Sequence, residues 1–285
     1  MTAVIDIGSN SVRLMLSNGA EKQKFLITTR LAEGKVDGAL SQISIDRTVN
    51  AVAVLFDKAI KSGADKIYAF ATAAVRNSKN GKTFTDSVLE KTGLNVDVVS
   101  GEVEAELALI GALKGSDGGV IDIGGGSTEI AVKQGGQTVY DVSYSFGAVT
   151  INSNFERNES EIANYLSSQI KGVKMRFEEK FHGVGGTIST LALINAGAAE
   201  YSPTAVEHKP ITLEDLKGIK SELYSLSPSE ISEKYPFASS RADIIAGGAE
   251  ILYSVMTAYG ISEIYASDSD NLEGYLIYRM AYEEK

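Results

Sequence analysis

Apolar residues recur along the chain with two different spacings, which predict alternating helices and strands. The clearest helix is expected over residues 44–62, with Ser44 as its N-cap and an apolar stripe at Ile45, Val49, Val52, Phe56 and Ile60. Similar stretches predict helices over 82–92, 102–114, 159–179, 188–196, 212–225, 240–259 and 271–284. Short apolar runs predict strands over 66–70, 95–99, 182–184 and 261–266. Strands that alternate with helices favour parallel pairing within mixed sheets, so the predicted fold class is α/β.

Glycines and loop-like composition suggest where some of these elements end. Gly93 and Gly115 are expected to terminate the helices that precede them, because glycine adopts the left-handed conformation common at helix C-termini. Residues 198–210 are expected to form an irregular loop.

One strand-like segment occurs twice. Val4-Ile5-Asp6-Ile7-Gly8 recurs as Val120-Ile121-Asp122-Ile123-Gly124, and each copy continues through a small-residue turn into a second apolar run. This is the pattern of a β-hairpin with an aspartate near the end of its first strand. The duplication predicts two related domains that face each other. We expect residues 1–116 to form the first domain together with a final helix over 270–285, and residues 117–269 to form the second.

Composition narrows the class of protein. A chain of 285 residues, 44% of them hydrophobic, can form two ordinary domains with a core each. The absence of cysteine excludes disulfides and thiolate metal sites. The N-terminus has no basic leader, and no apolar stretch approaches the roughly 20 residues of a membrane span. We therefore expect a soluble, cytoplasmic protein without a signal peptide or membrane segment.

The chain is acidic overall. Its formal net charge of -10 comes from 27 basic and 37 acidic residues. Proteins that bind long nucleic acids usually present a basic field, so nucleic acid is not an expected partner. A polyanionic substrate would have to be held by basic groups gathered locally.

Two small-residue turns are candidates for phosphate binding. The first contains Gly8, Ser9, Asn10 and Ser11, and the second contains Gly124, Gly125, Gly126 and Ser127. Such turns let backbone N–H groups approach an anion closely, although either alone could be an ordinary hairpin turn. If the turns face each other, they could clamp a phosphate chain. Asp6 and Asp122 would then hold a hard cation such as Mg²⁺ or Mn²⁺ beside the phosphates, through water.

Other residues could contribute to the same site. A third glycine run, Gly185-Gly186-Thr187, opens a predicted helix and suits either an anion contact or close helix–strand packing. Arg13 and Arg76 suit bidentate phosphate contacts, or alternatively surface salt bridges. The acidic helix start that includes Glu104 is ordinarily explained by the helix dipole alone. His182 and His208 form no metal-ligand pattern and are expected to be structural.

In family order, these segments resemble the exopolyphosphatase / guanosine pentaphosphate phosphatase (Ppx/GppA) family in its short form. The matching segments are residues 6–13, 71–76, 100–105, 122–129, 185–187, 241–243, 267–268 and 273–274. The resemblance implies the actin-like (ribonuclease H-like) two-domain ATPase fold, with a duplicated mixed sheet and flanking helices. It implies hydrolysis of a phosphoanhydride with a divalent metal in the interdomain cleft. It also implies that Glu104 acts as general base on the attacking water, with Arg76 as a further catalytic residue.

The chain departs from the family pattern at several positions. Val103 stands where the family often has an acid, and Glu106 where it has arginine. Asp270-Asn271-Leu272 replaces the usual glycine-leucine-arginine run. The loss of two basic groups favours a substrate shorter than long polyphosphate.

Three functions are compatible with these observations. The first is a hydrolase acting on polyphosphate or guanosine pentaphosphate, and the second is an ATP-using kinase of the same superfamily. The third is a non-catalytic sensor that binds an alarmone or polyphosphate. The partner expected in each case is a phosphate chain or a nucleotide, and a homodimer is possible.

Overall fold

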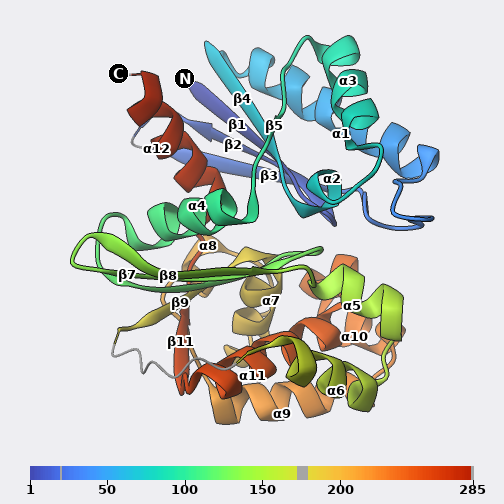
Figure 1. The fold of residues 1–285 in the computed structure, drawn as a ribbon, viewed down its shortest axis with the longest axis vertical. Helices are drawn as coiled ribbons and strands as arrows, with labels where there is room; N and C mark the ends of the chain where they lie inside the picture. Colours follow the sequence, from blue (N-terminus) through green and yellow to red (C-terminus); the bar gives the residue numbers. More distant parts are fainter. Residues whose placement is uncertain (20, 172–178, 284–285) are drawn as a thin grey trace.

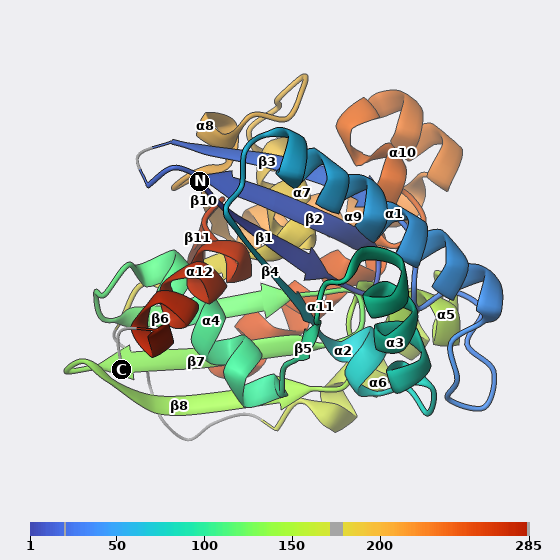
Figure 2. The ribbon, with the colours of Figure 1, turned by 90° about the horizontal axis from the view of Figure 1, so that it is seen from above.

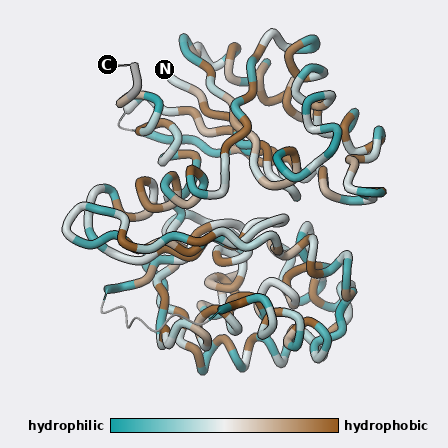
Figure 3. Tube along the Cα trace, in the orientation of Figure 1, coloured by the Kyte–Doolittle hydropathy of each residue, from teal (hydrophilic) through white to brown (hydrophobic). Residues whose placement is uncertain are grey.

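The computed structural model describes residues 1–19, 21–171 and 179–283, which form two β-sheets arranged one above the other in Figure 1. The first sheet has the order β3-β2-β1-β4-β5 and the second has the order β10-β11-β9-β6-β7-β8. In Figure 3, hydrophobic residues concentrate along the inner strands and on helix faces turned toward the sheets. Among the described residues, no helix is long and apolar enough to cross a membrane.

The first sheet is built from the N-terminal third of the chain. Its strands are β1 (Thr2–Ile7), β2 (Ser11–Ser17), β3 (Lys22–Thr28), β4 (Lys66–Ala71) and β5 (Asp97–Val98). Its helices are α1 (Gln42–Lys61), α2 (Ala73–Arg76) and α3 (Gly81–Thr92). Strand β1 pairs antiparallel with β2 and parallel with β4, so the sheet is mixed.

The second sheet repeats this arrangement. Strand β6 (Gly118–Ile123) pairs antiparallel with β7 (Thr128–Gln134) and parallel with β9 (Phe181–Val184). The remaining strands are β8 (Gln137–Tyr144), β10 (Pro210–Thr212) and β11 (Glu263–Ala266). The surrounding helices are α5 (Ala148–Phe155), α6 (Glu159–Gln169), α7 (Gly185–Asn195), α8 (Pro203–Val206), α9 (Leu213–Ser225), α10 (Pro228–Lys234), the 3₁₀ helix η1 (Pro236–Arg241) and α11 (Ile245–Tyr259). The duplicated hairpin predicted from the sequence is therefore a duplication of sheet topology.

Two helices lie where the halves meet. Helix α4 (Gly101–Leu113) is largely apolar and largely buried, with Glu102 and Glu106 on its exposed side. One side packs against α12 (Asn271–Glu283) and the other against β6, β7 and β8. Figures 1 and 2 both place α12 beside α4, although the two helices are far apart in the sequence. Helix α12 also contacts β1 of the first sheet.

Several predicted boundaries are wrong for identifiable physical reasons. Helix α1 begins after Ser41, whose hydroxyl accepts the Ser44 N–H, while Ser44 itself is buried and donates to the Glu33 carbonyl. Ile60 is 53% exposed and does not belong to the buried stripe. Gly93 ends α3 as expected, but α4 ends at Leu113, and its C-cap is Lys114, which adopts the left-handed conformation one residue before Gly115.

Other segments differ in extent. The strand expected over 95–99 is reduced to β5, and the loop expected over 198–210 contains α8 and the start of β10. The helix expected over 240–259 begins at Ile245, after η1. The helix expected over 159–179 ends at Gln169, and residues 172–178 of that prediction lie outside the described part. Strands β3 and β8 and helices α5 and α10 were not predicted. The exposed faces of the two strands weaken their apolar alternation.

The contact between α4 and α12 requires glycine on both helices, which leads to a stability prediction. A Cβ at Gly274 would overlap the Leu107 carbonyl, and a Cβ at Gly111 would overlap the Asp270 carbonyl. We expect Gly274→Ala to lower the free energy of unfolding by about 3 kcal/mol, because backbone on both sides would have to shift. Urea denaturation followed by circular dichroism measures this change.

Gly218 provides the matched control. It lies on an exposed face of α9, with open space where a Cβ would stand. Gly218→Ala should therefore stabilise the fold by about 0.5–1 kcal/mol, since alanine is the better helix former. Equal effects of the two substitutions would contradict the assigned role of Gly274.

Candidate active site

The two duplicated turns line one pocket between the sheets. In each turn the first glycine closes the loop: Gly8 donates to the Ser11 carbonyl and Gly124 to the Ser127 carbonyl, both at 3.0 Å. The pocket is lined by Asp6, Gly8, Ser9, Asn10, Ser11, Arg13, Thr72, Glu104, Asp122, Ile123, Gly124, Gly125, Gly126, Ser127, Ala148, Gly185, Gly186, Thr187, Arg241, Ile244 and Asn271. The structure thus brings together all of the predicted site residues except Arg76.

The turns approach each other closely enough to require glycine. A Cβ on Gly125 would stand 2.8 Å from Ser9 Cβ, and a Cβ on Gly126 would stand 2.6 Å from Ser9 Oγ. Such distances are shorter than van der Waals contact, so the bare backbone of one turn packs directly on the other. Because the two turns are in contact, the backbones of both line the same pocket.

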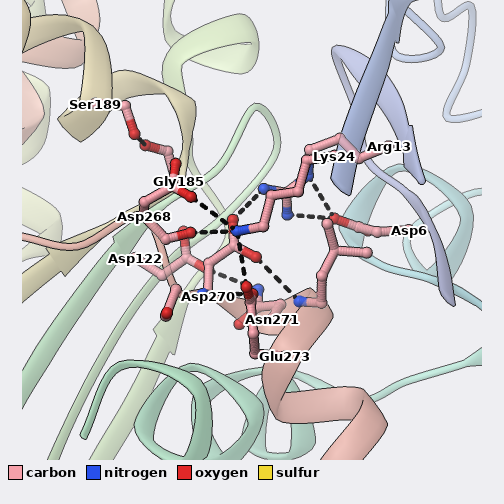
Figure 4. Close-up of polar contacts among 12 residues, drawn as sticks. Asp6, Arg13, Lys24, Asp122, Gly185, Ser189, Asp268, Asp270, Asn271 and Glu273 are labelled. Atoms are coloured by element: carbon pink, nitrogen blue, oxygen red, sulfur yellow. Dashed lines mark hydrogen bonds and ion pairs between the residues drawn. The ribbon is translucent and has the colours of Figure 1, made fainter. Parts of the chain in front are cut away.

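Asp6 and Asp122 lie at equivalent positions near the ends of β1 and β6. Both carboxylates are buried, and burial raises their pKa. For Asp6 the neighbouring Arg13 opposes this rise, while for Asp122 the charge of Asp270 adds to it and brings the pKa to about 6. Asn271 donates to Asp122 Oδ2 at 2.7 Å (Figure 4), whereas the buried Asp6 Oδ1 has no hydrogen-bond partner among the described residues.

Glu104 enters the pocket from the first turns of α4. Ser100 caps this helix by accepting the Val103 N–H, and the next turn directs Glu104 inward. Its Oε2 accepts from Arg76 Nη1 at 2.8 Å, and the same nitrogen lies 3.0 Å from the Val99 carbonyl oxygen. Burial outweighs Arg76 and raises the pKa of Glu104 to about 7. Arg76 does not line the pocket itself. It reaches the site through its hydrogen bond to Glu104.

Arg13, for which a phosphate contact or a salt bridge was predicted, is paired with two acids in the structure. It lies opposite Asp6 in the β1–β2 pair, and it forms ion pairs with Asp6 and with Asp270 of the segment before α12 (Figure 4). Burial alone would lower the pKa of Arg13, but Asp270 and Asp6 raise it well above its usual value. Arg13 reaches the pocket with its charge already compensated.

Arg241 is a pocket cation that the sequence arguments did not assign to the site. It is the last residue of η1, and a Cβ on Gly186 would collide with its guanidinium. No carboxylate pairs with it in the part of the chain that the structure describes. Burial, aided by repulsion from Arg13, lowers its pKa to about 10, so it stays charged at neutral pH. One signal in the sequence could have pointed to Arg241, because residues 241–243 are among the segments that match the family pattern.

Helix α7 explains the third glycine run. Gly185 adopts a φ of +89°, and its missing Cβ would stand 2.7 Å from Asp122 Oδ1. The run therefore serves close packing and also opens α7 at the pocket. The remaining lining residues, none of which was predicted, are Thr72, Ile123, Ala148, Ile244 and Asn271. His182 and His208 lie outside this pocket, as their structural interpretation requires.

Because Arg241 has no acidic partner among the described residues, its replacement should weaken phosphate binding without lowering the stability of the fold. Arg241→Gln should weaken the binding of inorganic phosphate by about tenfold or more, because a charge-assisted contact is lost. The same change should leave the melting temperature equal or higher, since it removes a partly buried charge that lacks a partner. Calorimetry and thermal denaturation measure the two effects.

Arg30→Gln is the matched control. Arg30 pairs with Asp243 at 3.1 Å and does not line the pocket. Its substitution should leave phosphate binding unchanged. If both variants bind phosphate like the unmodified protein, Arg241 is not an anion ligand.

The chain is similar to known proteins over nearly its whole length. The Ppx/GppA phosphatase family model matches residues 4–283. Exopolyphosphatase 2 of Mycobacterium tuberculosis is 27% identical over 307 aligned positions, covering 95% of this chain and 96% of that protein. The crystal structure of the Aquifex aeolicus member of the Ppx/GppA family has a TM-score of 0.80 at 26% identity, covering 100% of this chain and 98% of that one.

The likeness extends to more distant structures. An exopolyphosphatase from Cytophaga hutchinsonii shares the fold, with a TM-score of 0.86 at 20% identity over 99% of this chain and 98% of that chain. The predicted actin-like α/β fold with a duplicated mixed sheet is confirmed. The chain belongs to the Ppx/GppA phosphatase family.

Proposed function

We propose that this protein is a metal-dependent phosphohydrolase that releases the terminal phosphate of inorganic polyphosphate or guanosine pentaphosphate in the cleft between its two halves. The observation that carries the proposal is the position of Glu104. Its buried carboxylate lines the same pocket as both glycine turns and Arg241. Membership of a phosphatase family supports hydrolysis as the reaction.

The pocket residues divide the reaction between them. Backbone N–H groups of the two turns and the guanidinium of Arg241 would hold the terminal phosphate and stabilise the charge on its oxygens. Water attacks that phosphorus, the bridging P–O bond breaks, and the shortened chain leaves as an oxyanion. Glu104 accepts the proton of the water. Arg76 positions the Glu104 carboxylate and lowers its pKa against the effect of burial.

The carboxylates in the pocket fit a hard divalent cation. Asp6 Oδ1 is buried without a hydrogen-bond donor and belongs to a residue that lines the pocket, as does Asp122. The described residues contain no cluster of three or more His, Cys, Asp or Glu side chains suited to a metal. Two carboxylates with waters and phosphate oxygens are the usual environment of Mg²⁺. When bound by Asp6 and Asp122, Mg²⁺ or Mn²⁺ would neutralise charge on the phosphate chain.

The first test replaces the proposed base. Glu104→Gln should reduce phosphate release from polyphosphate or guanosine pentaphosphate by about 10²–10⁴-fold, because the amide cannot accept the proton. Substrate binding should persist, since the turns and Arg241 are untouched. Release is measured as free phosphate in the presence of Mg²⁺, and binding by calorimetry.

Glu106→Gln is the control, because it makes the same change on the exposed side of α4. It should behave like the unmodified protein. Phosphate release that survives Glu104→Gln would remove Glu104 from the mechanism. Tight binding without release by the unmodified protein would instead support a sensor.

The second test uses the raised pKa of Glu104. The carboxyl is protonated below pH about 7 and cannot accept a proton there. Phosphate release should therefore increase with pH, reach half of its plateau near pH 7 and level off about one pH unit higher. Arg76→Gln should move this rise to higher pH, because Arg76 is the group that lowers the pKa of Glu104. A rise that stays in place or moves to lower pH in Arg76→Gln would contradict the assignment. The measurement is the initial rate from pH 5 to 9.

A further inference from the structure

A second cavity, of about 260 Å³, adjoins the phosphate pocket. The two share Arg13, Gly185, Gly186 and Arg241. A different hollow beside Lys35 shares with the phosphate pocket Ser9 and Gly126, and these residues pack against each other and separate the two volumes. A third hollow, beside Arg30, shares only Asn10 and Ile244 with the phosphate pocket. The second cavity has the broadest junction of the three, so we take it as the continuation of a phosphate chain whose end lies in the first pocket.

The second cavity contains little uncompensated positive charge. Its cations are Arg13, Lys24 and Arg241. Lys24 lies 3.2 Å from Asp268 and 3.0 Å from Glu273, and Arg13 is paired with Asp6 and Asp270. Arg241 is the one of the three without an acidic partner among the described residues. Much of the remaining wall is apolar, formed by Phe25, Leu26, Leu193, Phe237 and Leu272.

Asp270 is held firmly in the position that compensates Arg13. It precedes α12, is buried, and its Oδ1 accepts the Leu272 N–H at 3.0 Å while Oδ2 pairs with Arg13 (Figure 4). The next residue, Asn271, donates to Asp122. Burial opposes the ionised form of Asp270, but Arg13 and Lys24 outweigh it and lower its pKa. The carboxylate is therefore charged, and a phosphate group entering this cavity meets it directly.

We propose that Asp270 is a specificity-determining residue that selects against long inorganic polyphosphate and restricts the substrate to short phosphoanhydrides. It does so by neutralising Arg13 where the two cavities join and by placing a carboxylate on the path of the chain. The proposal rests on the function proposed above and adds the class of substrate. A repulsive group placed against the wrong ligand is a common source of specificity.

The test removes this charge and compares two substrates. Asp270→Asn keeps an oxygen that can accept the Leu272 N–H and releases Arg13 from one carboxylate. The KM for long-chain polyphosphate should fall by about tenfold relative to the KM for tripolyphosphate, because a charge-assisted contact with Arg13 becomes available. The long-chain substrate should also become more sensitive to salt.

Asp243→Asn is the matched control. Asp243 also pairs with an arginine, Arg30, but lines neither cavity. The proposal is overturned if Asp270→Asn lowers both KM values equally or neither, or if Asp243→Asn produces the same change in preference.

A binding measurement separates this inference from the proposed reaction. Calorimetry of tripolyphosphate and long-chain polyphosphate with Glu104→Gln, with and without Asp270→Asn, reports the preference without turnover. If the unmodified protein releases no phosphate, the proposed function fails, and the binding ratio still decides the role of Asp270.

Asp270→Ser guards against misfolding, since serine also accepts at a helix N-terminus. A shift toward the long chain in either folded variant supports the proposal. Unfolding of both variants would assign Asp270 to the stability of α12 and overturn the proposal.

Discussion

The close packing of α4 against α12 sets the position of Glu104 relative to the segment that opens α12. Helix α4 carries Glu104, and the segment that opens α12 carries Asp270 and Asn271. The helices can approach because Gly111 and Gly274 leave their backbones in direct contact. A wider separation of the helices would move the proposed base, Glu104, relative to Asp270 and to Asn271, which donates to Asp122. A packing constraint between two helices is therefore also a constraint on electrostatics.

Acids outnumber cations around the pocket, and their burial makes each influence the others. Glu129 lies opposite Asp122 in the β6–β7 pair, and burial together with Glu104 and Asp122 raises its pKa well above the usual value. At the equivalent position in the first hairpin stands Arg13. The two halves thus repeat the backbone but not the charge. In the first half the strand aspartate is paired with Arg13, whereas in the second half Glu129 adds a further buried acid whose raised pKa favours its protonated form.

Local signals in the sequence were sufficient to predict the two hairpins, their turns and the aspartates. Each signal lies within about ten residues, where spacing and residue type decide the structure. The ion pair between Arg13 and Asp270 joins residues 257 positions apart, so no local pattern reveals it. Arg241 is similar, because it lies beside Gly186, a residue distant from it in the sequence. Exposed strands such as β3 were missed, since their alternation is weak.

The first sheet also depends on residues far away in the chain. Phe70 of β4 stacks on Tyr275 of α12 with ring centroids 4.5 Å apart, inside a cluster that includes Val4, Met15, Val99, Leu107 and Leu272. During synthesis, the strands of this sheet are made first, while the helix that covers this side of the sheet is made after the whole second half. Until then, apolar side chains of β1, β2 and β4 on this side remain without their cover. The nascent protein therefore exposes hydrophobic surface for most of its translation. Such surface is prone to aggregation, and chaperones protect nascent chains in this situation.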